Sequence, residues 1–203
     1  DRNLMMLLEL RQSGILDDRI YNAISAFSRE DFLPKKLKGF SREDLNLKIF
    51  NNIFASKTSD IARMIYLGLS YNNKVRNVLE IGTGSGWQSA LLSKIYHRVY
   101  TIEIDREAYL FSSNILKNIS NKISHKHGDG KLGWIDAGPF DAIYIDCCLE
   151  QEPEYLYSNL VKDEGVLVAA NKYDNKQYYC SCLPHSGKGL VKSNFEINRT
   201  LLL

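Results

Sequence analysis

The chain has 203 residues, of which 44% are hydrophobic and 25% are charged. These fractions are typical of globular proteins and exclude a disordered or fibrous chain, and the length suits one α/β domain. The net charge of +2 provides no basic stripe for nucleic acid, and no apolar run approaches the roughly 20 residues of a membrane-spanning helix. We therefore expect a soluble protein with neither a nucleic-acid nor a membrane partner.

Short amphipathic helices are predicted at the start of the chain, where apolar residues recur at helical spacing. Pro34 interrupts this pattern, and the lysine-rich residues 35–39 are typical of a solvated turn. We expect the first part of the chain to form an N-terminal helical cap. Its apolar positions are Leu4, Leu7, Leu8, Ile15, Ile20, Ile24 and Phe27.

The pentapeptide Phe-Ser-Arg-Glu-Asp occurs twice, at 27–31 and at 40–44. The period is too short for a solenoid repeat, and no third copy follows. We interpret the repetition as coincidence.

From residue 59 onward, helical and strand patterns alternate. A helix begins near Ser59 or Asp60, either of which can cap its first turn. This alternation predicts a doubly wound, mostly parallel α/β sheet, in which ligands bind beyond the carboxyl ends of the strands. The predicted strands cover 75–81, 98–104, 122–127, 140–145 and 165–170, and the predicted helices between them cover 88–95 and 107–119.

A glycine-rich loop follows the first of these strands. Trp87 stands where the dinucleotide fingerprint requires glycine, and the loop lacks the lysine of a P-loop. Glu80 precedes the loop, and a carboxylate there suits a cofactor with a sulfonium and an ammonium group better than a pyrophosphate. The pattern therefore points to S-adenosyl-L-methionine, held by Glu80 and by the loop residues Gly82, Thr83, Gly84, Ser85 and Gly86.

Further candidate contacts with the cofactor follow the second and third strands. Glu103 ends the second strand about twenty residues after the loop, where a carboxylate can accept hydrogen bonds from both hydroxyls of a ribose, and Ile104 comes next. Asp129 and Gly130 lie in the loop after the third strand, at a place suited to receive the adenine amino group.

With these residues, the chain resembles the protein-L-isoaspartate O-methyltransferases, which are class I enzymes dependent on S-adenosyl-L-methionine. The resemblance implies a Rossmann-like fold and a cytoplasmic repair enzyme that methylates the free carboxyl group of isoaspartyl residues in damaged proteins. It rests on residues 26–34, which are similar to the family's REDFVP segment, and on residues 78–86, 100–103, 128–130, 140–141 and 165–168.

The resemblance also implies a functional serine, which the family carries in a Gly-x-Gly-Gln-Thr-Ile-Ser-x-Pro segment. Counted back without gaps, Ser56 falls on that serine, although its neighbours differ: Phe50 and Asn52 replace the glycines and Thr58 replaces the proline. Ser56 is therefore our candidate catalytic residue, with the role of orienting the substrate. Capping of the helix that follows is the alternative interpretation.

Asp146 ends the fourth strand, where the family has Val-Thr-Ala-Ala and this chain has residues 145–148. We include it among the cofactor contacts, through the amino group of S-adenosyl-L-methionine. The alternatives are a catalytic base and a satisfied polar group at the edge of the sheet.

A cation-dependent small-molecule O-methyltransferase is the first alternative function, but Ala170 stands where that class needs a second metal-binding acid. A protein that binds the cofactor without isoaspartyl activity is the second. His97 and His125 have no partners at metal spacing, so we expect no metal site, and the four cysteines are predicted to be reduced thiols. We expect a monomer with one methyltransferase domain over 1–203, divided into a cap and substrate segment over 1–58 and a cofactor-binding core over 59–203.

Overall fold

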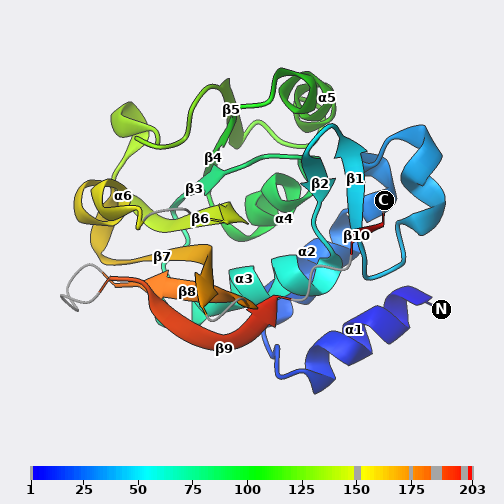
Figure 1. Cartoon of the computed structure of the whole chain (residues 1–203), viewed down its shortest axis with the longest axis horizontal. Coiled ribbons are helices and arrows are strands. Elements are labelled where there is room, and N and C mark those ends of the chain that lie inside the picture. Colours follow the sequence, from blue (N-terminus) through cyan, green and yellow to red (C-terminus); the bar gives the residue numbers. More distant parts are fainter. Residues whose placement is uncertain (1, 149–151, 174–175, 184–188, 198–200, 203) are drawn as a thin grey trace.

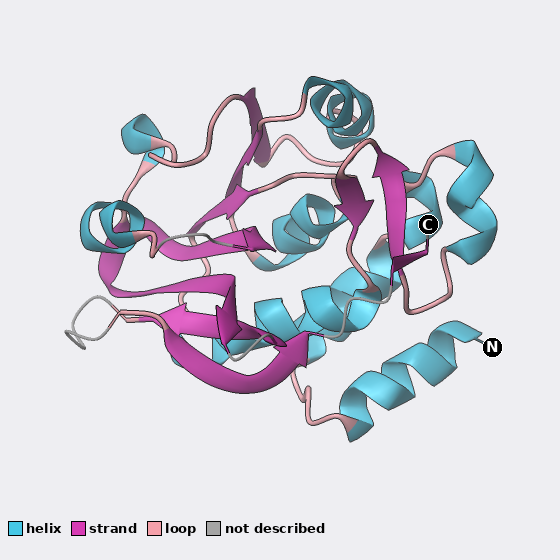
Figure 2. Cartoon of the chain, in the orientation of Figure 1, coloured by secondary structure: helices cyan, strands magenta, loops and turns pink. Residues whose placement is uncertain are grey.

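The computed structural model describes residues 2–148, 152–173, 176–183, 189–197 and 201–202. A seven-stranded sheet runs through the middle of the molecule, and helices pack against it (Figure 1, Figure 2). Its strands follow the order β5-β4-β3-β6-β7-β8-β9. Their bounds are β3 Asn77–Ile81, β4 Arg98–Glu103, β5 Ile123–His127, β6 Phe140–Cys148, β7 Val161–Tyr173, β8 Lys176–Cys182 and β9 Val191–Ile197.

The sheet is parallel from β5 to β7, and β8 and β9 continue it in antiparallel fashion. The chain passes from β3 outward through β4 to β5 and then returns to the other side of β3 as β6. The strand order therefore reverses between β3 and β6, which is where ligands bind in doubly wound sheets. The predicted α/β class with a mostly parallel sheet is confirmed.

The C-terminal part of the sheet is larger than the sequence predicts. β6 and β7 extend beyond the predicted 140–145 and 165–170, and neither β8 nor β9 is predicted. Residues 176–182 and 191–197 do not alternate regularly between apolar and polar side chains, and such alternation is the signal on which a strand prediction depends.

Helices α3, α4 and α5 pack on one face of the sheet, and α2 packs on α3 and α4. Figure 1 labels these helices. The other face carries the short helix α6 and the loop through Trp134. The predicted N-terminal helical cap is present as α1 and α2. None of the helices in the described part of the chain has the length and apolar character needed to cross a membrane. The helices are α1 Arg2–Gln12, α2 Asp18–Ala26, α3 Thr58–Tyr71, α4 Trp87–Ile95, α5 Arg106–Leu116 and α6 Glu154–Asn159.

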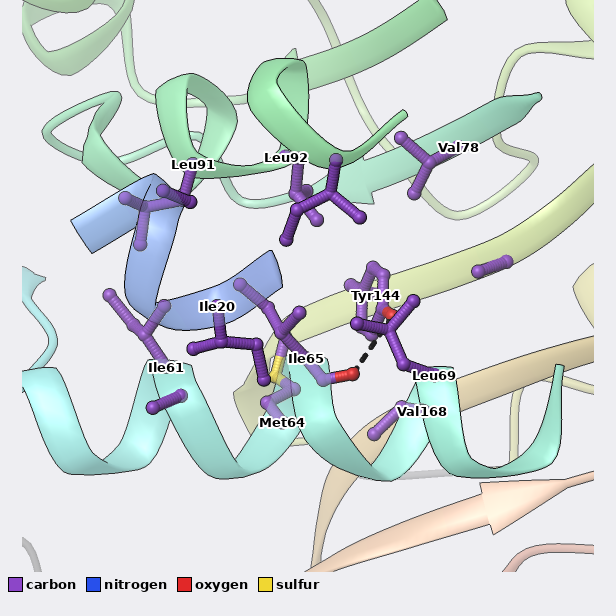
Figure 3. Packing of buried hydrophobic residues seen from close by; sticks show 14 of the residues in the cluster. Ile20, Ile61, Met64, Ile65, Leu69, Val78, Leu91, Leu92, Tyr144 and Val168 are labelled. Atoms are coloured by element: carbon purple, nitrogen blue, oxygen red, sulfur yellow. Dashed lines mark hydrogen bonds between the residues drawn. The ribbon is translucent and has the colours of Figure 1, made fainter. Parts of the chain in front are cut away.

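The core between the sheet and α3 is closely packed (Figure 3). Tyr144 of β6 is fully buried there, and its hydroxyl donates to the carbonyl oxygen of Ile65 at 3.3 Å. A Cβ atom at Gly68 would overlap the ring of Tyr144, so the helix needs a glycine at that position. Each large apolar side chain buried in this core contributes about 1.5–3 kcal/mol to stability. The core thus fixes α3, whose N-terminus faces the ligand end of the sheet.

The segment between α2 and α3 is more ordered than the sequence predicts. It contains a β-hairpin, which β10 extends to a small three-stranded sheet. The lysine-rich stretch forms a 3-10 helix rather than an open turn, although its residues 35 and 36 are exposed as expected. The bounds are η1 Arg29–Phe32, η2 Lys35–Phe40, β1 Asn46–Phe50, β2 Ile53–Ala55 and β10 Leu201–Leu202.

Helix α3 begins differently from the prediction. Lys57 occupies the N-cap position and forms no side-chain cap, whereas Ser59 and Asp60 lie within the first turn. The backbone N–H of Ser59 instead donates to Asp44 Oδ1 at 2.9 Å. An acid from the preceding segment thus supplies the cap, which the local sequence does not reveal.

Candidate active site

A cavity of about 1050 Å³ opens at the carboxyl ends of β3, β4 and β6. The loop after β3 and the loop after β5 line one part of it, and the β1–β2 hairpin and the end of β6 line the other. We call these parts the cofactor half and the acceptor half. The cavity lies where the strand order reverses and is large enough for a nucleoside cofactor.

The glycine loop after β3 has a backbone that only glycine adopts without strain. Gly82, Gly84 and Gly86 have φ angles of +94°, +54° and +87°. The N–H of Gly84 donates to Glu103 Oε2 at 2.7 Å, which ties the loop to the end of β4. Of the loop residues predicted to hold the cofactor, Gly82, Thr83, Gly84 and Ser85 line the cavity, whereas Gly86 lies behind them at the start of α4.

Glu80 lies beneath this loop, fully buried, and it is not part of the cavity wall. Its Oε2 accepts hydrogen bonds from the hydroxyls of Ser89 and Thr101, and Thr101 in turn lies 2.6 Å from the hydroxyl of Thr83. Burial raises the pKa of the Glu80 carboxyl to about 8. The arrangement differs from the expected direct contact with the cofactor, because Glu80 supports the loop from below through Thr83.

Glu103 lines the cavity at the end of β4, and its side chain is held in place by the backbone. Oε2 accepts from the N–H of Gly84, and Oε1 accepts from the N–H of Asp105 at 2.9 Å. Each carboxylate oxygen retains a further lone pair for a ligand hydroxyl. Ile104, the next residue, is exposed and offers an apolar surface at the cavity edge.

Asp129 and Gly130 form the far side of the cofactor half. Asp129 is exposed, and its Oδ1 accepts from the N–H of Lys131 at 2.9 Å. A Cβ atom at Gly130 would overlap the Ile81 side chain, so this loop approaches the glycine loop only because it has a glycine there.

Ser56 and Asp146 meet in the acceptor half. Ser56 Oγ donates to Asp146 Oδ2 at 2.6 Å, which joins residues 90 positions apart in the sequence. Both side chains are partly buried, and both line the cavity. Because the N-cap position of α3 is Lys57, the alternative role of Ser56 as a helix cap is wrong.

Several residues of the cavity wall are missed by sequence reasoning. Asn52, Ile53 and Phe54 reach it from the β1–β2 hairpin. Phe50 holds this hairpin against α5 by an edge-on contact with Phe111, whose ring centroid lies 5.4 Å away. In the sequence, the run of apolar residues 53–55 could indicate a short strand, but it does not show that this strand will line the cavity.

Acidic side chains prevail on the described part of the cavity wall. This negative surface favours a ligand with positive charge. Nearby, burial raises the pKa of Asp60 to about 7, and the charge of Asp146 adds to that effect. The acidic residues on the wall are Glu103, Asp129, Asp146, Glu152 and Glu154, and Lys131 contributes a positive charge.

The residues of the cofactor half fit S-adenosyl-L-methionine. The glycines leave bare backbone for the nucleoside, Glu103 presents an oriented carboxylate, and the negative wall complements a sulfonium. Elsewhere, His97 is exposed and His125 Nδ1 lies 3.0 Å from Ser113 Oγ. Among the described residues, no three His, Cys, Asp or Glu side chains gather closely enough to hold a metal ion.

Comparisons with known proteins agree with this geometry. The model of the family Protein-L-isoaspartate(D-aspartate) O-methyltransferase matches residues 1–197. The protein-L-isoaspartate O-methyltransferase of Pseudoalteromonas atlantica is 33% identical over 191 residues, which cover 94% of this chain and 89% of the relative.

Two solved structures share the fold. A protein-L-isoaspartate O-methyltransferase aligns with a TM-score of 0.81 at 20% identity, over 98% of this chain and 65% of that longer chain. A Plasmodium falciparum protein, solved as a beta-aspartate methyltransferase in complex with S-adenosyl-L-homocysteine, aligns with a TM-score of 0.79 at 19% identity over 98% and 97% of the two chains.

Proposed function

This chain belongs to the protein-L-isoaspartate(D-aspartate) O-methyltransferase family, and from that premise we propose how its residues divide the work. The enzyme transfers a methyl group from S-adenosyl-L-methionine to a carboxylate oxygen of isoaspartyl residues in damaged proteins. The observation that carries this proposal is the meeting of Ser56 and Asp146 beside the glycine loop, within one cavity at the reversal of the sheet.

The cofactor half binds the nucleoside. S-adenosyl-L-methionine, when bound, supplies a methyl group activated on a positively charged sulfur. Glu103 accepts hydrogen bonds from the ribose hydroxyls, and Asp129 accepts one from the adenine amino group. The bare backbone of Gly82 and Gly84 allows close approach, because a side chain there would occupy ligand space and strain the loop.

The acceptor half orients the carboxylate that receives the methyl group. A carboxyl group with a pKa near 4 is already ionised at neutral pH, so no general base is needed. What remains for the protein is to hold one oxygen in line with the methyl group and to exclude water, and such positioning lowers a barrier by several kcal/mol. The hairpin residues Ile53 and Phe54 exclude water, and Ser56 provides the orienting hydrogen bond.

The bond between Ser56 and Asp146 adds a proton requirement. A serine hydroxyl has one proton, and in the structure Ser56 uses that proton in its hydrogen bond to Asp146. When Ser56 turns this proton to an ionised acceptor, the Asp146 carboxylate loses its hydrogen-bond donor and faces a second carboxylate. We propose that binding of the acceptor is accompanied by protonation of Asp146, which removes the repulsion between two neighbouring carboxylates.

The test of the function is methyl transfer to a matched pair of peptides. The chain is incubated with S-adenosyl-L-methionine labelled in the methyl group and with a synthetic isoaspartyl peptide or its normal aspartyl twin. We expect label on the isoaspartyl peptide alone. Equal label on both peptides, or no label on either, contradicts the proposed acceptor. The proposal also includes a monomeric enzyme of the cytoplasm.

A further inference from the structure

Arg29 is a buried cation outside the cavity wall. It is 5% exposed, and within the described part of the chain it makes no ion pair with a carboxylate. Burial lowers the pKa of its guanidinium to about 10, and the charge of Asp44 partly opposes this effect. Arg29 is therefore still charged at neutral pH, and burial of such a charge is costly unless its hydrogen bonds are satisfied.

The guanidinium of Arg29 donates to four backbone carbonyl oxygens. Two belong to the segment before β1: Glu43 O lies 3.0 Å from Nη1, and Leu45 O lies 2.8 Å from Nη2. The other two end the hairpin: Ala55 O and Ser56 O lie 3.1 Å and 2.9 Å from Nη2. One side chain thus binds both ends of the β1–β2 hairpin.

This arrangement fixes the backbone of Ser56, the residue that we propose orients the acceptor carboxylate. The carbonyl group of Ser56 accepts from Arg29, and its hydroxyl donates to Asp146. The position of Ser56 Oγ therefore depends on Arg29 through one peptide unit. The hairpin that Arg29 closes also supplies Ile53 and Phe54 to the cavity wall.

Arg29 also touches the start of the helix behind the glycine loop. Its Cζ atom lies 5.9 Å from the ring centroid of Trp87, which is the first residue of α4. The Trp87 indole N–H donates to the carbonyl oxygen of Phe27 at 2.9 Å, which holds the ring beside Arg29. Arg29 is thus packed against α4 while its hydrogen bonds go only to the hairpin.

We propose that Arg29 is a positioning residue for methyl transfer, which sets the geometry of the acceptor half by holding Ser56 and the hairpin. The inference rests on the proposed function. A lysine cannot replace this arginine, because a planar guanidinium presents five donors in a fixed fork, whereas an ammonium presents three donors from a single point. We expect the cofactor half to keep its geometry when Arg29 becomes lysine, since none of the four hydrogen bonds of Arg29 reaches the glycine loop or Glu103, and a lysine can still lie over the Trp87 ring.

The chain contains a matched control for the test. The pentapeptide that includes Arg29 recurs at 40–44, where Arg42 occupies the equivalent position and is exposed. Arg29→Lys and Arg42→Lys therefore make the same chemical change within the same five residues. We expect Arg29→Lys to lower kcat/KM for the isoaspartyl peptide by about 10- to 100-fold, and Arg42→Lys to leave it unchanged.

Two readouts separate positioning from general destabilisation. The dissociation constant of S-adenosyl-L-homocysteine should stay within about twofold of wild type in Arg29→Lys, because no hydrogen bond of Arg29 reaches the cofactor half. Adding Ser56→Ala to Arg29→Lys should cause little further loss, since in our proposal both changes remove the orienting action of the Ser56 hydroxyl, one by displacing it and the other by deleting it. Equal losses in cofactor affinity and turnover, or fully additive losses in the double variant, would overturn the proposal, as would wild-type turnover in a folded Arg29→Lys.

Hydrogen exchange makes the test independent of the acceptor. Backbone amides of the hairpin, residues 46–57, should exchange about 10-fold faster in Arg29→Lys than in Arg42→Lys, whereas residues 82–86 should keep their wild-type rates. If wild-type protein fails to methylate the isoaspartyl peptide, the proposed function fails while the exchange result still decides the role of Arg29. Unchanged exchange in the hairpin overturns it.

Discussion

The two halves of the cavity are built in different ways. In the cofactor half, the bond from Gly84 to Glu103 joins residues 19 positions apart, and both follow directly from the ends of neighbouring strands. In the acceptor half, Ser56 binds a residue 90 positions away, and Arg29 reaches 27 positions to hold it. The cofactor half is thus formed by residues at the ends of neighbouring strands, whereas the acceptor half is formed by segments that are distant in the sequence.

This difference indicates which residues determine the specificity for the acceptor. A glycine loop and a strand-end acid can be reused with many acceptors, because they contact only the nucleoside. In our proposal the hairpin, Ser56 and Asp146 line the space beyond the sulfur, so we expect changes there to alter specificity and to leave cofactor binding in place. Four substitutions can break or sharpen this comparison.

The largest effect is expected for Glu103→Ala. The change removes the ribose acceptor and releases the N–H groups of Gly84 and Asp105. Affinity for S-adenosyl-L-homocysteine should fall by roughly 30- to 100-fold, or about 2–3 kcal/mol, measured by calorimetry. Glu107→Ala, an exposed acid at the start of α5, is the control. An affinity equal to that of the control removes Glu103 from the ribose site.

Glu80→Gln tests the support beneath the glycine loop. The pKa of Glu80 is raised from 4.5 to about 8 in the folded state, so the folded chain keeps a proton that the unfolded chain releases. The stability that this proton provides is complete below pH 4.5 and is lost as the pH rises through 8. Glutamine cannot titrate. The free energy of unfolding of Glu80→Gln should therefore rise by about 2 kcal/mol relative to that of wild type between pH 5 and pH 6.5, at about 1.4 kcal/mol per pH unit. Denaturant titrations at each pH measure this difference. Parallel pH profiles would show that Glu80 does not carry the proton.

Ser56→Ala should separate the two halves. Loss of one orienting hydrogen bond should lower kcat/KM for the isoaspartyl peptide by about 10-fold, or about 1.4 kcal/mol. Cofactor affinity should not change. Ser70→Ala, at the exposed C-terminal end of α3, the helix that follows Ser56, is the control. If cofactor affinity falls together with turnover, the division into halves does not hold at Ser56.

The smallest effect is expected for Asp146→Asn, and it concerns pH. The amide can donate permanently to Ser56 Oγ, as protonated Asp146 would, so Ser56 is free to donate to the acceptor. The KM of wild type for the isoaspartyl peptide should rise as the pH increases from 6 to 9, because acceptor binding takes up a proton at Asp146 and fewer protons are available at high pH. In Asp146→Asn this rise should shrink by a few-fold. A steeper rise in the variant contradicts the proton requirement.

The same comparison explains what the sequence predicts and what it does not. The parallel strands, the glycine loop and Glu103 follow from local patterns, since each depends on residues near in the chain. Ser56 and Asp146 are both candidates from the sequence, but their contact is not predicted, because it depends on how the hairpin folds over the end of β6. The placement of Glu80 is misjudged for a related reason: its position before the loop does not show which way its side chain points.

Arg29 shows the limit of local reasoning most clearly. Its pentapeptide occurs twice, yet one copy places its arginine in the interior and the other places Arg42 at the surface. Identical neighbours thus lead to opposite environments, because long-range packing against the hairpin and Trp87 decides burial. No local rule distinguishes the two copies.

A crystal structure of the chain with S-adenosyl-L-homocysteine tests the central claim most directly. We predict that the ribose hydroxyls lie within hydrogen-bonding distance of the Glu103 carboxylate and that the sulfur faces the Ser56–Asp146 pair. A nucleoside bound outside this cavity, or a sulfur turned away from that pair, would contradict the account.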